Sequence, residues 1–308
     1  MLTIFTIPKG FDGGHTEVIQ RNAVASWTKL NPGCEIVLCG DDPGVEQVAK
    51  EYGVRWIGDI QRNEFGTPIL QSAFSKVAES SRFQTLCYVN ADIVLFDDLL
   101  SSIKDVDFNK AVIAGQRWDV DITELWDFSD SDYEQNLRKT IADIGVLHPP
   151  LGSDYFIFDK NSKVLDIPPF GVGRPGWDCW FIYRVRQLGM RMVDGTPSIT
   201  LIHQNHDYSH LKSKSGQTAD GRKWAGPEVA RNRDIIGGKE RYFNLRDCTH
   251  ELIDGRVKLA LDYRHIRSRW YRLPVLNPMT RPLFNALDFI LSLPLLNRIK
   301  SVFRSQES

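Results

Sequence analysis

The sequence predicts an α/β fold with a mixed, mainly parallel sheet flanked by helices. Short apolar runs alternate with amphipathic segments through the first 115 residues, and connections of about ten or more residues between such runs are typical of parallel strands with helical crossovers. With 308 residues, of which 42% are hydrophobic, the chain is long enough to bury a full core. We therefore expect one large domain followed by a smaller appendage.

The expected elements alternate regularly before residue 115. Strands are expected at residues 2–7, 35–39, 54–57 and 85–89. Helices separate them, because apolar residues recur at helical spacing in each interval. These residues are Ile19, Ala23, Trp27 and Leu30, then Val45, Val48, Ala49 and Tyr52, and finally Leu70, Phe74, Val77 and Ala78. Ligands of such sheets bind at the carboxyl ends of the strands, so the residues that follow each strand are candidates for a site.

The pattern is less regular after residue 115. The expected elements are a helix that ends near residue 142, strands at 153–159 and 198–204, a helix at 176–189, and a hairpin at 249–260 that turns at Asp254 and Gly255. Between Asp119 and Glu134 the sequence carries seven acidic residues and no basic one. Charge runs are usually solvated, so we interpret this segment as an exposed flap.

Composition excludes several classes of protein. A formal net charge of -1 gives no global attraction for nucleic acid. No basic segment followed by a long apolar stretch opens the chain, so no signal peptide is expected. The apolar run at 289–296 is far shorter than the roughly 20 residues of a membrane-spanning helix. The cysteines contain no CxxC pair, which favours a reducing cytoplasm over a disulfide framework; they are Cys34, Cys39, Cys87, Cys179 and Cys248.

The C-terminal segment, residues 256–308, has a distinct character. It holds ten Lys and Arg against three Asp and Glu. An amphipathic helix is expected from its apolar spacing, and a second short helix after Pro294. This basic amphipathic tail either packs on the domain or on a second subunit of a homodimer, or it lies in the interface of an anionic membrane. The apolar positions are Leu283, Phe284, Leu287, Ile290 and Leu291.

One strand is followed at once by polar residues. The run "TLCYV" ends on Asn90, Ala91 and Asp92 before an apolar run resumes. An uncompensated charge at the end of a buried strand costs several kcal/mol, roughly, so a partner or a metal is expected at Asp92. The alternative is that Asn90 and Asp92 cap the turn, as such side chains often do.

This arrangement resembles the Asp-x-Asp segment of nucleotide-sugar-dependent glycosyltransferases of the GT-A fold, a Rossmann-like α/β fold. The resemblance implies that Asn90, Ala91 and Asp92 contact a nucleotide diphosphate sugar. It also implies that Asp92 and Asn90 bind a divalent metal, Mn²⁺ or Mg²⁺, on the diphosphate. This copy of the motif begins with Asn90, whose neutral oxygen predicts a lower metal affinity.

A second match lies in "GVGRPGWDCWFIYRV", residues 171–185. It is similar to the Gly-rich turn and acidic helix start of inverting GT-A enzymes, which implies that Asp178 is the general base for the acceptor hydroxyl. By the same resemblance the backbone of the turn approaches the sugar at Gly171, Gly173 and Gly176, and either Trp177 or Trp180 stacks on the sugar ring. The alternative is that Asp178 only stabilises the helix N-terminus.

Three histidines, His203, His206 and His210, lie at the end of the strand at 198–204 and just after it. His203 and His206, and less directly His210, resemble the late metal ligand that several GT-A families supply. A zinc site and a purely structural role are the alternatives, although no cysteine lies nearby to complete a zinc site.

Further contacts with the nucleotide are implied by position alone. In the GT-A family the end of the first strand holds the nucleoside, and a later turn and helix start lie close to the nucleotide. The corresponding residues are Thr6, Ile7, Pro8 and Lys9, followed by Arg62 and Gln71. For each of them a loop or capping role is the alternative.

Together these features predict a metal-assisted, inverting glycosyltransferase of polysaccharide biosynthesis, cytoplasmic or peripheral to the membrane. Residues 1–255 would form the catalytic domain, with a nucleotide-binding half at 1–115 and an acceptor half at 116–255. The partners implied are a nucleotide-sugar donor and a glycan or lipid-linked acceptor, with no nucleic acid. A sugar nucleotidyltransferase and a non-catalytic nucleotide-sugar-binding protein are the alternatives.

Overall fold

The computed structural model describes residues 1–30, 33–206 and 226–271. The chain divides into two compact units, residues 1–259 and 260–308. Within the second unit, helix α8 (Tyr263–Tyr271) lies in the described part. The amphipathic helices expected beyond residue 280 lie outside the described residues. The architecture below is that of the first unit.

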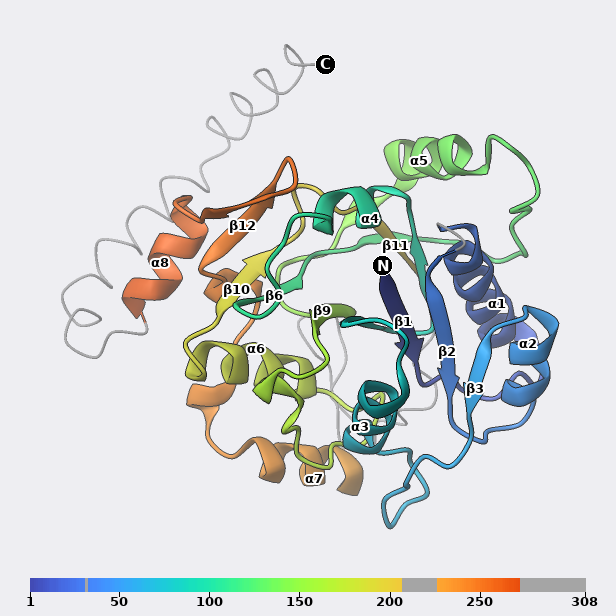
Figure 1. The fold of residues 1–308 in the computed structure, drawn as a ribbon, viewed down its shortest axis with the longest axis horizontal. Coiled ribbons are helices and arrows are strands. Elements are labelled where there is room, and N and C mark those ends of the chain that lie inside the picture. The colour runs from blue at the N-terminus through green and yellow to red at the C-terminus, as the bar shows by residue number, and fades with distance from the viewer. Residues whose placement is uncertain (31–32, 207–225, 272–308) are drawn as a thin grey trace. The chain divides into compact units, whose positions relative to one another are not determined.

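The first unit is built on a large mixed sheet (Figure 1). Its order is β13-β12-β10-β6-β9-β4-β1-β2-β3. Strand β9 is antiparallel to both of its neighbours, and β13 is antiparallel to β12, whereas the other pairs are parallel. The strands are β1 (Leu2–Thr6), β2 (Glu35–Cys39), β3 (Arg55–Ile57), β4 (Thr85–Val89), β6 (Ala111–Ala114), β9 (Tyr155–Asp159), β10 (Arg191–Asp194), β12 (His250–Ile253) and β13 (Arg256–Leu259).

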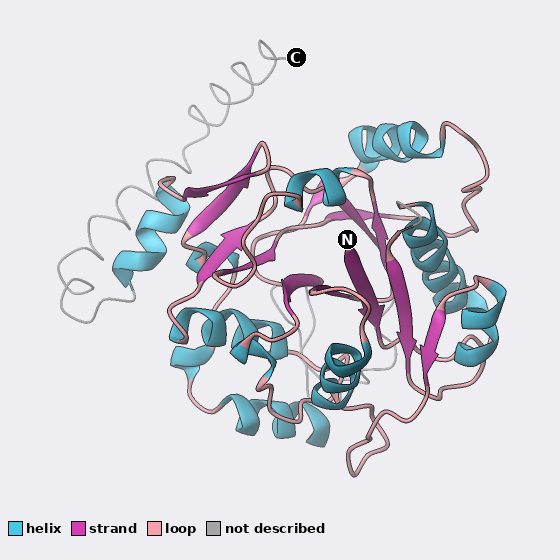
Figure 2. Ribbon diagram, viewed as in Figure 1, coloured by secondary structure: helices cyan, strands magenta, loops and turns pink. Residues whose placement is uncertain are grey.

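Helices surround the strands (Figure 2). The helices of the first unit are α1 (Gly14–Lys29), α2 (Val45–Glu51), α3 (Leu70–Ser80), α4 (Asp98–Ile103), α5 (Tyr133–Ile144), α6 (Trp177–Gln187) and α7 (Pro227–Ile236). Short 3-10 turns lie at Lys163–Leu165, Lys239–Arg241 and Leu245–Asp247.

Alternating side chains of the strands enter two separate cores. In β1, Ile4 packs with Trp27 of α1 on one face of the sheet, while Phe5 packs with Phe74 of α3 and Phe181 of α6 on the other. Successive side chains of a strand point to opposite faces, so a sheet covered on both sides is apolar along its whole length. This explains why the strand sequences show continuous apolar runs rather than alternation.

A second, four-stranded sheet lies in the order β5-β11-β7-β8. It contains β5 (Ile93–Leu95), β7 (Trp118–Val120), β8 (Val146–Leu147) and β11 (Leu201–Gln204). In its register His203 faces Ile93 of β5 on one side and Asp119 of β7 on the other. This sheet therefore joins the segment after β4 to residues more than 100 positions later in the chain.

The structure confirms the predicted α/β fold with a mixed, mainly parallel sheet. The four strands expected before residue 90 and the helices between them form close to the predicted positions. The hairpin also forms, with Asp254 and Gly255 both at positive φ in its turn. Strands β5, β6, β7, β8 and β10 and helices α4 and α7 were not predicted. Among the described residues no helix is both long and apolar enough to cross a membrane.

Candidate metal and active site

Strand pairing brings Asp92 and His203 together. The chain turns after β4, where the amide of Ile93 donates to the carbonyl oxygen of Asn90 at 3.3 Å, and then enters β5. Because β5 pairs with β11, His203 lies across from Ile93, next to Asp92. Gln204 holds the turn between β4 and β5 against β11, because its backbone and side-chain amides donate to the carbonyl oxygen of Asp92 at 3.2 and 3.1 Å.

Two imidazoles face one oxygen of the Asp92 carboxylate. Nε2 of His206 lies 3.1 Å, and Nε2 of His203 3.6 Å, from Oδ2 of Asp92. The other oxygen, Oδ1, is buried and makes no hydrogen bond. Burial alone would raise the pKa of Asp92, but the charges of His203 and His206 outweigh it and lower the pKa to about 2. Asp92 is therefore an ionised carboxylate with one oxygen lacking a partner.

This donor set fits a divalent metal ion. One ligand atom from each of Asp92, His203 and His206 can be chosen so that all three lie within 4.8 Å of one another. A buried polar atom without a hydrogen bond calls for an explanation, and a cation at the unpartnered carboxylate oxygen supplies one. Imidazole nitrogens suit transition-metal ions, and carboxylate oxygens suit Mn²⁺ as well as Mg²⁺. The mixed set of one carboxylate and two imidazoles therefore favours a transition-metal ion, Mn²⁺ among them, over Mg²⁺.

A ring of polar contacts encloses this cluster. Asn90 donates from its side-chain amide to Oδ1 of Asp154 at 2.8 Å, and Arg117 donates to the other oxygen of Asp154. Arg117 also donates through Nε to Oδ1 of Asp119 at 2.9 Å. Asp119 in turn lies 3.0 Å from Nδ1 of His203. These contacts are called the ring below. They start at Asn90, pass through Asp154, Arg117 and Asp119, and end at His203, which faces Asp92.

Asp178 lies beside this ring, in the first turn of α6. Backbone amides of Cys179 and Ser153 donate to its carboxylate, but burial outweighs them and raises its pKa, with a further contribution from the charge of Asp154. Gly152 separates Asp178 from the ring: a methyl group at this glycine would lie 3.8 Å from Oδ2 of Asp178 and 4.0 Å from Nη1 of Arg117. A carboxyl group with a raised pKa is suited to accept a proton near neutral pH.

The other residues that the sequence predicts to contact a nucleotide take no part in the cluster of Asp92, His203 and His206. Thr6, Ile7 and Pro8 are buried at the carboxyl end of β1, and Lys9 is exposed just beyond it. Arg62 forms ion pairs with Asp41 and Asp42, which follow β2. Gln71 is exposed in the first turn of α3. Roles for these residues toward a nucleotide stay predictions.

Trp177 and Gly176 have structural roles. Trp177 is only 6% exposed, and its ring packs against Tyr88 and Phe156 at centroid distances of 5.1 and 5.4 Å. Gly176 has φ of 101°, and a Cβ there would lie 2.5 Å from Ile236. These contacts account for both residues, and they give no support to stacking of Trp177 on a sugar.

Sequence reasoning missed two members of the ring, Arg117 and Asp154, and also His148, which lies 2.7 Å from Oδ2 of Asp119. It misread Asp119, which was assigned to the exposed acidic flap. That assignment is wrong for Asp119, whose side chain is only 20% exposed and accepts from Arg117 and His148. A signal was present, because an Arg and an Asp two residues apart lie on the same face of a strand. His210, a weaker candidate, lies outside the described residues.

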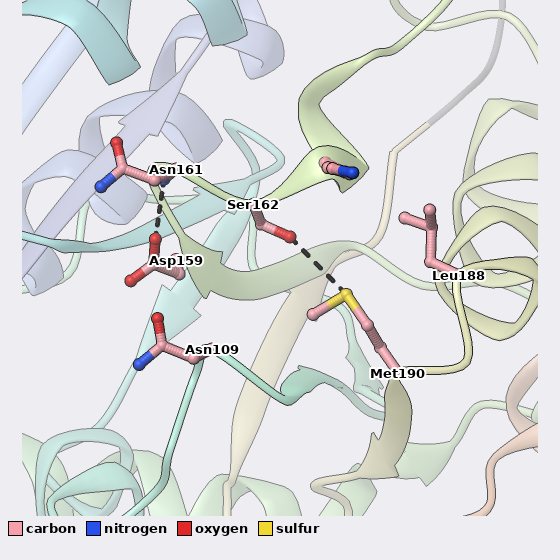
Figure 3. A pocket seen from close by; sticks show the side chains of 7 residues that line it. Asn109, Asp159, Asn161, Ser162, Leu188 and Met190 are labelled. Atoms are coloured by element: carbon pink, nitrogen blue, oxygen red, sulfur yellow. Dashed lines mark hydrogen bonds between the residues drawn. The ribbon is translucent and has the colours of Figure 1, made fainter.

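One pocket lined by described residues lies elsewhere. It is found at the opposite edge of the sheet, where β9 ends and β6 and β10 begin (Figure 3). Its polar groups bond to the protein itself: Asp159 accepts from Gln84 and from the amide of Asn161, and Ser162 donates to the sulfur of Met190. It is separate from the candidate site and does not contribute to it. The lining residues are Asn109, Asp159, Asn161, Ser162, Lys163, Leu188 and Met190.

Solved structures with related architecture include three sugar-metabolising proteins. A mannosyltransferase from Pyrobaculum calidifontis, in complex with GDP-Man and Mn²⁺, aligns over 68% of this chain and 58% of its own, with 9% identity and a TM-score of 0.43. GalNAc-T7, with UDP, GalNAc and Mn²⁺, aligns over 68% and 44%, with 17% identity and a TM-score of 0.41. Glucosyl-3-phosphoglycerate synthase from Mycobacterium tuberculosis, with Mg²⁺ and UDP, aligns over 68% and 74%, with 12% identity and a TM-score of 0.40.

Other comparisons identify no family. No protein-family model matches the sequence, and no curated protein sequence is significantly similar to it. This chain spans little more than half of the mannosyltransferase and less than half of GalNAc-T7. All three TM-scores are below 0.5, so these likenesses assign no function to this chain.

Proposed function

We propose that this protein is a GT-A-type glycosyltransferase that moves a sugar from a nucleotide diphosphate sugar to an acceptor hydroxyl, with inversion. The observation that carries the proposal is the joint placement of two kinds of group at one site. The Asp92, His203 and His206 cluster offers a cation site with a buried, unpartnered carboxylate oxygen. Asp178, a separate carboxyl group with a raised pKa, lies beside the ring that encloses this cluster.

The cluster would bind the donor through Mn²⁺. Asp92, His203 and His206 would hold the ion, with Asn90 as a further proposed ligand through its side-chain oxygen. When bound, such an ion stabilises the negative charge of a departing diphosphate. The location is suitable, because ligands of open α/β sheets bind outside the carboxyl ends of the strands, and Asp92 follows β4 at that edge.

Asp178 would act as the general base. Displacement with inversion requires a carboxylate that takes the proton of the acceptor hydroxyl as the new bond to the anomeric carbon forms. The position of Asp178 in the first turn of α6 holds its backbone in place. Gly152 carries no side chain between Asp178 and Arg117, where even a methyl group would be in van der Waals contact with both side chains.

Purified protein with Mn²⁺ and a panel of UDP- and GDP-sugars tests this proposal. We expect Mn²⁺-dependent stabilisation by UDP or GDP in a thermal-shift assay, since a ligand of the folded state raises the melting temperature. We also expect slow, Mn²⁺-dependent hydrolysis of one donor, with the configuration of the released sugar inverted in early NMR spectra.

Three other outcomes would contradict the proposal. Retained configuration would remove the inverting mechanism and the base role of Asp178. Consumption of a nucleoside triphosphate together with a sugar 1-phosphate would identify a nucleotidyltransferase. Mn²⁺-dependent binding of nucleotide sugars without turnover, with acceptors present, would identify a binding protein.

A further inference from the structure

His203 lies between two carboxylates. Its Nε2 faces Oδ2 of Asp92 at 3.6 Å, and its Nδ1 faces Oδ1 of Asp119 at 3.0 Å. The His203 side chain is only 5% exposed, so solvent offers it few alternative partners. A neutral imidazole carries one N–H and one lone pair, and only the nitrogen with the lone pair can bind a metal. The position of that single proton therefore decides whether His203 can act as a ligand beside Asp92.

Asp119 is held firmly in its place beside His203. Parallel pairing of β7 with β11 sets Asp119 opposite His203. Arg117 donates to Oδ1 of Asp119 at 2.9 Å, and Nδ1 of His148 lies 2.7 Å from Oδ2. Asp119 is therefore a carboxylate that can only accept hydrogen bonds.

An acceptor beside Nδ1 favours one tautomer. A proton on Nδ1 is attracted by Asp119, whereas a lone pair on Nδ1 would face the negative carboxylate oxygen. The angle at Nδ1 is too bent for a full hydrogen bond despite the 3.0 Å distance, so the attraction is mainly electrostatic. Metal-binding histidines commonly have a carboxylate at the second ring nitrogen, which fixes the tautomer and raises the basicity of the ligand nitrogen.

We propose that Asp119 is a positioning residue that holds His203 as the Nδ1–H tautomer, with the lone pair of Nε2 directed toward a metal ion on Asp92. This inference rests on the proposed metal site and adds a role that no motif in the sequence indicated. His148 supports Asp119 by occupying its other oxygen, which leaves Oδ1 for Arg117 and His203. Arg117 connects this arrangement to Asp154 and hence to Asn90.

The variant Asp119→Asn tests the role with little change of shape. Its amide group can donate to Nδ1, so we expect His203 to change to the Nε2–H tautomer. Two-bond ¹H–¹⁵N correlation spectra of ¹⁵N-labelled, metal-free protein distinguish the tautomers, and His203→Asn assigns the signal. The spectra are recorded above the pH at which that signal titrates. We expect Mn²⁺ affinity, measured by calorimetry, to fall about 10- to 100-fold.

Two further variants control the measurement. Asp127→Asn removes an exposed carboxylate of the same acidic segment, one that accepts from Ser129, and should change neither readout. Asp119→Glu keeps the carboxylate and should keep the Nδ1–H tautomer, with part of the Mn²⁺ affinity restored. A role of Asp119 limited to pairing with Arg117 would change stability without moving the tautomer.

The outcomes separate this inference from the proposed function. A folded Asp119→Asn protein that keeps the Nδ1–H tautomer and binds Mn²⁺ as tightly as wild type overturns the inference alone. A wild-type protein that binds no Mn²⁺ overturns the metal site, on which the inference rests. If Asp119→Asn does not fold, His148→Gln, which loosens the other oxygen of Asp119, should lower Mn²⁺ affinity by a smaller factor, and an unchanged affinity overturns the inference.

Discussion

The two ends of strand β9 carry buried aspartates in contrasting surroundings. Asp159, at the carboxyl end, is 4% exposed and accepts from the Gln84 amide at 2.9 Å on both oxygens and from the backbone of Asn161 at 2.7 Å. Asp154, just before the amino end, is 8% exposed and accepts from Arg117 and Asn90. The first aspartate has neutral partners, and the second belongs to a chain of charges that leads to Asp92.

This difference separates structural polar groups from candidate functional ones. At the Asp159 end the carboxylate oxygens have donors, which is the usual condition of buried polar atoms. At the Asp154 end the network reaches a buried oxygen of Asp92 with no hydrogen bond, and two imidazoles that face one carboxylate oxygen. Burial of a polar group therefore does not by itself mark a site; Asp92 is distinguished because a buried oxygen without a hydrogen bond occurs together with two imidazoles on the same carboxylate.

The largest expected effect is that of Asp92→Ala. This change removes the one carboxylate that both Nε2 atoms face, so we expect Mn²⁺ affinity to fall by at least about 100-fold and Mn²⁺-dependent nucleotide binding with it. Calorimetric titration with Mn²⁺ measures the loss, and the far-UV circular dichroism spectrum should stay that of wild type. A variant that bound Mn²⁺ and UDP or GDP normally would remove the contrast between the two ends of β9.

A smaller effect, limited to turnover, is expected for Asp178→Asn. Loss of a general base commonly costs about 10² to 10⁴ in rate, while Mn²⁺-dependent binding of the donor should survive. Because burial raises the pKa of Asp178, wild-type turnover should fall on acidification through a pKa above the ordinary value of Asp. Steady-state transfer rates as a function of pH measure both the loss of rate in Asp178→Asn and the fall of wild-type turnover at acidic pH. Retention of most of the turnover would place the base elsewhere.

The same substitution at the two ends of β9 should have unequal effects on stability. Asp154→Asn leaves Arg117 buried with one carboxylate partner fewer, and breaking a buried ion pair costs about 3 kcal/mol. Asp159→Asn removes no ion pair, so about 1 kcal/mol is expected. Urea titrations give the free energy of unfolding of each variant, and the Mn²⁺ affinity of each variant is a second readout. Only Asp154→Asn should lower that affinity, and equal effects on both quantities would contradict the comparison.

An effect of the same order concerns the acid stability of the metal-free protein. The pKa of Asp92 in the folded state, about 2, lies below its ordinary value of 3.8. Its carboxylate therefore stabilises the folded state above pH of about 4, and this contribution is lost as the pH falls through about 2. The shift corresponds to about 2 kcal/mol. The difference in free energy of unfolding between wild type and Asp92→Asn, with EDTA present, should shrink by this amount from pH 6 to pH 2, and a difference independent of pH would contradict it.

Much of the fold was predictable because its signals are local. Apolar strands and the helical spacing of Ile19, Ala23 and Trp27 depend on neighbouring residues in the chain, and these elements formed where expected. The positions of Asp92, His203 and Asp178 at element ends were predictable for the same reason. The short strands β7 and β8 were not, because two or three residues carry too little periodic signal.

The sequence by itself determined the α/β class and placed Asp92, His203 and Asp178 where strands end or a helix begins. Only the tertiary structure decided that Asp119 and Asp154 belong to the same site and that both histidines face one oxygen of Asp92. The reason is physical: periodicity reports which face of an element is buried, but the order and register of strands depend on contacts between residues far apart in the chain. The ring of polar side chains is made of such contacts.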